Sequence, residues 1–144
     1  MNETIEKFGY PATLIHEYEH WFVLLRPAQP TLGSLVLAAK SDARAFADLP
    51  PAAFTEMSRA VADIERVLQG AVAYQRINYL MLMMVDPNVH FHVIPRYEGT
   101  RDHSGLLFED KGWPKTPSLG DAVALNAEHT VALAGWLKGL WQAG

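Results

Sequence analysis

The sequence predicts an α+β domain with a mostly antiparallel five-stranded sheet, a long helix after the third strand and a C-terminal helix. Short apolar segments of strand length occur early and in the middle of the chain, and the segment 51–70 between two of them has helical periodicity. Helical periodicity returns near the C-terminus. Because no repeat or linker divides the chain, residues 1–144 are expected to form a single domain.

The first three strands are expected at residues 12–15, 21–25 and 34–38. The polar stretch 16–20 separates the first two, which predicts a hairpin-like pair. The stretch 26–33 is rich in turn-forming residues and leads into the third strand.

The long helix is expected over residues 51–70. Pro51 suits the first turn of a helix, and Gly70 suits its end. Apolar residues recur at helical spacing on one face, and charged residues occupy the others. The apolar face comprises Phe54, Met57, Val61, Ile64 and Leu68.

Residues 77–85 are too apolar to have a solvent-facing side, so they predict an interior strand covered on both faces. A tight turn at Asp86 and Pro87 is expected to join it to the fifth strand. Residues 97–119 are rich in Gly, Pro and charge and predict a long ordered loop that could border a site. The C-terminal helix is predicted by a stripe of Val123, Ala127, Thr130, Ala134, Leu137 and Trp141.

The composition of the chain argues against several classes of function. The absence of cysteine excludes disulfides, thiolate nucleophiles and cysteine-ligated metal centres. A formal net charge of −4 argues against a general nucleic-acid binder. No apolar run reaches the roughly 20 residues that a membrane span needs, and the first residues lack the pattern of a signal peptide. A cytoplasmic protein is therefore expected.

The fifth strand carries the candidate site. Asn88, His90 and His92 alternate with apolar residues, so all three polar side chains are expected on one face of the sheet. Arg96 follows shortly and is a fixed positive charge suited to phosphate or carboxylate. This polar face predicts a small-molecule site.

The pattern around these residues resembles the histidine triad (HIT) superfamily of nucleotide hydrolases and transferases. The segments that carry the resemblance are 19–25, 30–37, 46–49 and 89–96. It covers roughly residues 15–97 and implies a HIT-like fold, with residues 98–144 divergent.

The resemblance implies a specific chemistry. His90 aligns with the nucleophile that attacks the α-phosphorus of a nucleotide conjugate and forms a covalent nucleotidyl-histidine. His92 aligns with the last histidine of the triad, beside the phosphate and the leaving group, in a hydrogen-bonding or proton-delivering role. Family members are commonly homodimers. No cofactor is required, although a polyphosphate substrate could bring a divalent cation such as Mg²⁺.

This chain departs from the family pattern at three places. Asn88 replaces the first histidine, and an amide cannot gain a proton near neutral pH. Only Asp86 and Pro87 stand where the family has a Gly- and Gln-containing loop. Arg26 stands where Asn or Asp is common and, with Arg96, is a candidate substrate-binding residue, although either arginine could be an ordinary surface residue.

Two alternatives remain at the level of sequence. The domain could bind a nucleotide, or only a protein partner, without turnover. Less favoured is a metal site in which His90 and His92 are joined by Glu98, Asp102 or His103.

Overall fold

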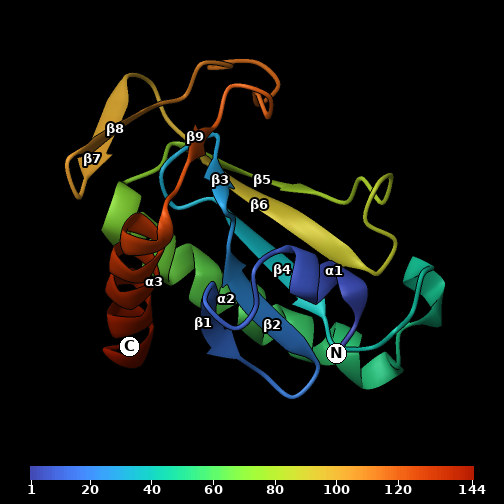
Figure 1. Cartoon of the computed structure of the whole chain (residues 1–144). Coiled ribbons are helices and arrows are strands. Elements are labelled where there is room, and N and C mark those ends of the chain that lie inside the picture. Colours follow the sequence, from blue (N-terminus) through green and yellow to red (C-terminus); the bar gives the residue numbers. More distant parts are fainter.

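The computed structural model describes residues 1–144 and contains the predicted five-stranded antiparallel sheet (Figure 1). The strands in spatial order are β1 (Leu14–Glu17), β2 (Trp21–Leu25), β4 (Leu35–Ala39), β6 (His90–Arg96) and β5 (Arg76–Leu80). The long helix α2 (Pro51–Val72) follows β4, the third strand of this sheet. The predicted fold class is therefore confirmed.

The sheet has helices on both faces. Helices α2 and α3 (Ala127–Gln142) pack on one face over the main core, and the short helix α1 (Glu3–Lys7) lies against the other (Figure 1). A smaller cluster under α1 consists of Ile5, Phe22, Leu24, Val36 and Ala38. No helix is both long enough and apolar enough to cross a membrane.

The register between β4 and β6 decides which side chains face α1. Val36 pairs with His92 and Ala38 pairs with His90, so both histidines share the α1 face with the smaller cluster. The alternate residues of β6, such as Val93, point to the main core. The alternation predicted for this strand is confirmed.

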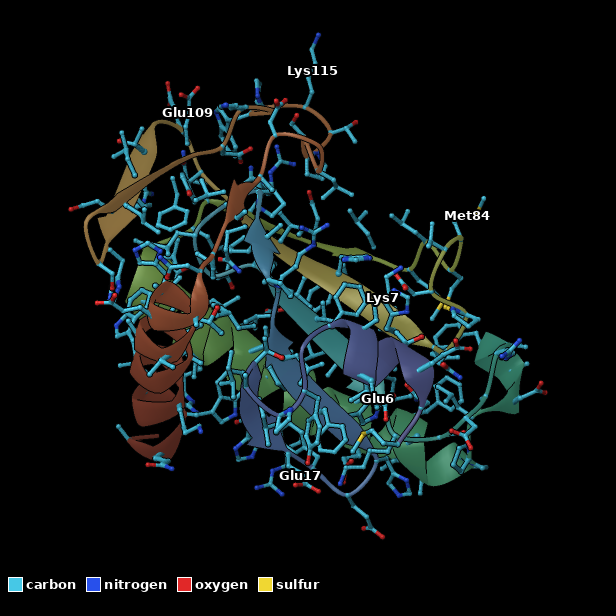
Figure 2. All side chains as sticks on the ribbon, in the orientation of Figure 1. Glu6, Lys7, Glu17, Met84, Glu109 and Lys115 are labelled. Carbon is cyan, nitrogen blue, oxygen red and sulfur yellow. The ribbon has the colours of Figure 1, made fainter.

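The prediction of an interior strand over residues 77–85 is wrong. Strand β5 ends at Leu80 and lies at the edge of the sheet, and residues 81–89 form a loop. Met84 and Val85 in this loop are 84% and 79% exposed, and Figure 2 shows Met84 directed away from the body of the protein. Met83 adopts a left-handed φ of 54°, which breaks the extended path. The hydrophobicity of this segment predicted burial, but its apolar side chains from Met81 onward lie in a loop.

Other boundaries shift modestly. Helix α2 continues past Gly70 to Val72 and ends at Ala73, whose N–H donates to the carbonyl of Gln69. Helix α3 begins after Asn126, whose side chain accepts the N–H of His129. The remaining short elements are β3 (Ala28–Gln29), which pairs with β9 (Val123–Ala124), and the 3₁₀ turn η1 (Phe46–Asp48).

The predicted loop over residues 97–119 contains a hairpin of β7 (Thr100–His103) and β8 (Leu106–Glu109). Phe108 is fully buried, and its carbonyl accepts the hydroxyl of Tyr97 at 3.0 Å. The side chain of Phe108 therefore holds the hairpin to the body and is not available to a ligand.

A buried ion pair anchors the segment after this hairpin. Arg96 Nε donates to Asp110 Oδ2 at 2.7 Å, and the Arg96 Nη2 group donates to Oδ1 at 3.1 Å. Both side chains are almost completely buried. The third guanidinium nitrogen of Arg96 donates to Asn78 Oδ1 at 2.9 Å. Arg96 therefore has its hydrogen-bonding capacity committed to the fold.

We predict that Asp110→Ala lowers the free energy of unfolding by about 3–5 kcal/mol, because it leaves the buried Arg96 charge uncompensated. Urea unfolding followed by circular dichroism measures this loss. The matched control is Asp102→Ala on the exposed edge of β7, which should stay within about 0.5 kcal/mol of the wild type. Equal effects of the two substitutions would show that the ion pair does not anchor the loop.

Candidate active site

His90 is held in one tautomer by the backbone. It is the first residue of β6 and is 1% exposed. Its Nδ1 lies 2.7 Å from the carbonyl oxygen of Asn88. Since a carbonyl can only accept, Nδ1 carries the proton in this contact, and Nε2 keeps its lone pair. That arrangement prepares Nε2 to act as a nucleophile.

His92 is held in the opposite tautomer. Arg26 Nε donates to His92 Nδ1 at 3.3 Å, so the proton of the neutral ring resides on Nε2. Burial, together with the charges of Arg26 and His90, lowers the pKa of His92 to about 4. His92 is therefore neutral near pH 7, and it can donate a hydrogen bond but holds no extra proton to deliver.

Arg26 is brought into the site by the turn after β2. Its Nη1 donates to the carbonyl of Ala28 at 2.5 Å, which fixes the guanidinium beside His92. Its Nη2 makes no hydrogen bond within the protein. Burial lowers the pKa of Arg26, but an arginine remains charged at neutral pH. The structure thus places a fixed cation with free donor capacity next to the histidines.

The side chain of Asn88 is directed toward the N-terminal helix. Asn88 Oδ1 accepts the hydroxyl of Thr4 at 3.0 Å, and Nδ2 donates to the carbonyl of Asp42 at 3.1 Å. The backbone N–H of Asn88 donates to Thr4 Oγ1 at 3.1 Å. Asn88 therefore contributes to the site through its backbone carbonyl on His90, while its amide fastens α1 to the sheet.

A cavity of about 220 Å³ opens in front of the two histidines. We call it the histidine cavity; it is lined by Phe8, Arg26, His90, His92 and residues 82–86. The Phe8 ring lies 5.5 Å from the His90 ring and 5.7 Å from the His92 ring, centroid to centroid. Lys7 Nζ and Asp86 Oδ1, 2.8 Å apart, connect α1 to the loop that lines this cavity.

Sequence reasoning missed the N-terminal contribution to the site. Asn2 caps α1 by accepting the N–H of Ile5 at 2.9 Å, and Glu3 and Glu6 lie in the first turn. An asparagine followed by acidic residues is a recognisable start of a helix, so this element could have been found. No signal in the sequence indicates that Phe8 meets the histidines.

Several candidate residues lie away from the histidine cavity. Arg96 is tied to Asp110, as described above. His103 stacks on Trp136 with ring centroids 4.1 Å apart. No group of three metal-ligating side chains occurs anywhere in the chain. The structure therefore brings neither Glu98, Asp102 nor His103 to His90 and His92 as a third metal ligand.

Comparison with known families gives a match. A family model described as HIT domain matches residues 8–99. This range contains the strands of the main sheet, the long helix and both histidines of the site. A search of curated proteins by sequence finds no match.

Solved structures with the same fold include several histidine triad proteins. The protein from Sinorhizobium meliloti has a TM-score of 0.73 and 21% identity, covering 96% of this chain and 94% of that one. A histidine triad protein from Bradyrhizobium japonicum has a TM-score of 0.72 and 17% identity, covering 96% and 95%. The NitFhit protein of Caenorhabditis elegans has a TM-score of 0.66 and 15% identity, and the match covers 90% of this chain but 27% of the NitFhit chain. At these identities the likeness establishes the fold.

We predict that Asn88→Ala and Thr4→Val each lower the free energy of unfolding by about 1–3 kcal/mol, because each leaves buried hydrogen-bonding groups without a partner. The double variant should lose less than the sum, since the two residues share these bonds. Urea denaturation of the four proteins measures this coupling. Asn88→His should also destabilise the fold, because Asn88 is 4% exposed and the imidazole is larger than the amide. Additive losses would contradict the proposed anchoring role.

We also predict that His92 stays neutral in the folded protein down to about pH 4, measured by NMR titration of its ring protons. An unfolded histidine titrates near pH 6.5, so between these values the unfolded chain binds a proton that the folded protein excludes. The contribution of His92 therefore lowers the free energy of unfolding as pH falls from about 6.5 to about 4. Arg26→Gln should raise the pKa of His92 by removing a neighbouring positive charge. A wild-type titration near pH 6.5 would refute the assignment.

Proposed function

Because the chain belongs to the HIT family, we propose that it is a nucleotidyl hydrolase or transferase that acts at the α-phosphate of a nucleotide conjugate through His90. One observation carries this proposal: the bond from His90 Nδ1 to the Asn88 carbonyl leaves the lone pair of Nε2 free at a cavity. Arg26 supplies a cation beside the same cavity. The loss of the first triad histidine does not remove this arrangement.

In the first step His90 Nε2 attacks the α-phosphorus and forms a nitrogen–phosphorus bond. The bond from phosphorus to the leaving group breaks, and its electron pair departs with the leaving group. The phosphorylated ring now carries a positive charge, and its Nδ1–H donates to the Asn88 carbonyl, which stabilises that charge. In the second step water or another acceptor attacks phosphorus, loses a proton to solvent and releases His90.

Two donors can stabilise the charge that develops on the phosphate oxygens. The Nε2–H group of His92 and the free Nη2 group of Arg26 belong to side chains that line the histidine cavity. Both are fixed before substrate arrives, by the contact between them and by the bond from Arg26 to Ala28. Preorganised donors of this kind stabilise a transition state without reorganising during the reaction.

The protonation states favour one class of bond. Asn88 has no proton to give, and His92 is neutral near pH 7 because its pKa lies at about 4. A leaving group that departs as a stable anion needs no proton, whereas an amine does. We therefore propose cleavage of phosphoanhydrides in preference to phosphoramidates, with nucleotide binding without turnover as the alternative.

We also propose a homodimer. Strand β5 leaves one edge of the sheet unpaired. A wholly apolar groove of about 190 Å³ lies beside it, between β5 and α2, and is lined by Leu37, Met57, Val61, Tyr79 and Phe91. A second copy that pairs at this edge would cover the groove and satisfy the free backbone groups of β5.

The proposal predicts an intact-mass increase of one nucleotidyl group on His90 during turnover of a dinucleoside polyphosphate, with release of a nucleoside phosphate. Mass spectrometry of the rapidly quenched protein, with peptide mapping of the adduct, measures it. His90→Ala should abolish the adduct and the turnover, because it removes the nucleophile. His129→Ala, at a partly exposed position on α3, is the matched control and should retain both.

The alternative, nucleotide binding without turnover, predicts a different result. A thermal shift with nucleotide, but no adduct and no product from a panel of dinucleoside polyphosphates and nucleoside phosphoramidates, would identify a binding module and refute the catalytic proposal. Turnover that survives in His90→Ala would refute the role of His90.

A further inference from the structure

The largest cavity of the protein has a volume of about 620 Å³ and shares no lining residue with the histidine cavity. It lies between β5 and residues 113–117 of the segment after the hairpin, which Figure 1 shows in orange. We call it the Trp113 cavity. Small-molecule sites typically measure roughly 300–1,000 Å³, so this cavity is large enough to hold a ligand of its own.

Positive charge dominates the lining of the Trp113 cavity. Arg76 and Lys115 both line it, and neither forms an ion pair. Arg96 also lines it, but Asp110 neutralises the charge of Arg96. No aspartate or glutamate is among the lining residues, although the chain contains 16 acidic residues and carries a net charge of −4. A cavity with cations and no carboxylate concentrates anions from solution.

The amide and indole groups of this cavity present hydrogen-bond donors. Asn78 Oδ1 accepts from Arg96, and Gln75 Oε1 accepts the backbone N–H of Glu98 at 2.6 Å. With both oxygens already accepting, the NH₂ groups of these two amides are left without a partner in the protein. The indole N–H of Trp113 is also unpaired, and an indole can only donate. A carboxylate or phosphate group, which consists of acceptor oxygens, complements this set of donors.

The segment that carries Trp113 and Lys115 is fixed before a ligand arrives. The N–H of Trp113 donates to the carbonyl of Asp110 at 3.2 Å, and the side chain of Asp110 is held by the buried ion pair described above. The N–H of Lys115 donates to the carbonyl of Gly112 at 2.7 Å and closes a tight turn. A Cβ at Gly112 would overlap the carbonyl oxygen of Thr116, so this turn requires glycine. The segment is therefore a preorganised wall of the cavity.

Trp113 adds an aromatic surface to this wall. The three other tryptophans each lie against an aromatic ring or an imidazole of the protein, whereas Trp113 lies against none. Its side chain is half-buried and lines the cavity. An indole without an aromatic partner offers its face to a flat ring of a ligand.

We propose that the Trp113 cavity is a second ligand site, separate from the histidine cavity, which binds a small aromatic oxyanion: a carboxylate or a phosphate monoester on a flat ring. The oxyanion accepts from Arg76 and from the amides of Asn78 and Gln75. The ring stacks on Trp113. Figure 2 shows Lys115 extending outward from the loop, where its charge attracts the anion to the cavity.

Isothermal titration with phenyl phosphate and with benzoate tests this site and distinguishes the two oxyanions. At least one of them should bind the wild type, and Arg76→Glu should weaken that binding about tenfold or more, the loss expected for a charge-assisted contact. Lys138→Glu is the matched control, because it makes the same charge change at an exposed position on α3 that forms no ion pair. It should leave the affinity unchanged. No binding of either compound to the wild type, or equal affinities in the two variants, would overturn the assignment.

Saturated analogues separate the contribution of the ring from that of the charge. The wild type should bind the flat ring about threefold or more tightly than cyclohexyl phosphate or cyclohexanecarboxylate, which carry the same oxyanions. Trp113→Leu should abolish this preference, because it removes the stacking surface. Equal affinities for flat and saturated rings in the wild type, or a preference that persists in Trp113→Leu, would refute the aromatic part of the assignment.

Amide NMR spectra locate the ligand without any need for turnover. Binding in the Trp113 cavity should shift the indole N–H signal of Trp113 and the side-chain NH₂ signals of Gln75 and Asn78, while the backbone signals of His90 and His92 stay in place. Such shifts would support the site even if the proposed nucleotidyl chemistry at His90 fails. Shifts centred on His90 and His92 would place the aromatic anion in the histidine cavity and overturn the assignment.

Discussion

The register of β6 between β4 and β5 is the constraint on which the site depends. With Val36 opposite His92 and Ala38 opposite His90, Phe91 and Val93 of β6 face the main core under α2 while the histidines face α1. A slip of one residue would exchange the two faces and bury imidazoles in the main core. Burial of apolar side chains in the main core therefore fixes this register, and the register fixes the position of the histidines. The chemistry of the site is specified by hydrophobic burial on the opposite side of the same strand.

The second level of organisation is local and polar. The Asn88 carbonyl sets the proton of His90, and Arg26 sets the proton of His92, so the two rings present opposite groups to the same cavity. One ring offers a lone pair and the other a hydrogen-bond donor. The Asn88 amide meanwhile holds α1, at whose C-terminal end Phe8 packs beside both rings. Asn88 thus contributes a structural side chain without a titratable group, together with a backbone carbonyl that sets the tautomer of His90.

Sequence reasoning succeeded where periodicity and burial agree. The alternation in β6 and the helical repeat of α2 each follow from a repeated pattern, and both elements form where they were expected, although Phe54 of the predicted apolar face is 41% exposed. It failed for residues 81–85, because an apolar run contains no information on whether a strand continues or a loop begins. It also could not find the Arg96–Asp110 pair, whose partners are 14 residues apart and meet only through the hairpin. In the sequence, an arginine that contacts a ligand looks the same as an arginine that forms a buried ion pair within the fold.

Positive charge is distributed unevenly along β5 and β6. Arg96 is neutralised by Asp110, which leaves Arg76 and Lys115 as the uncompensated cations at one end and Arg26 at the other. The neutral state of His92 agrees with the position of Arg26 at the same cavity, since a leaving group that departs as an anion needs no proton from the protein. We infer that the neutral His92 and the cation Arg26, which line the same cavity, both favour a leaving group that departs as an anion.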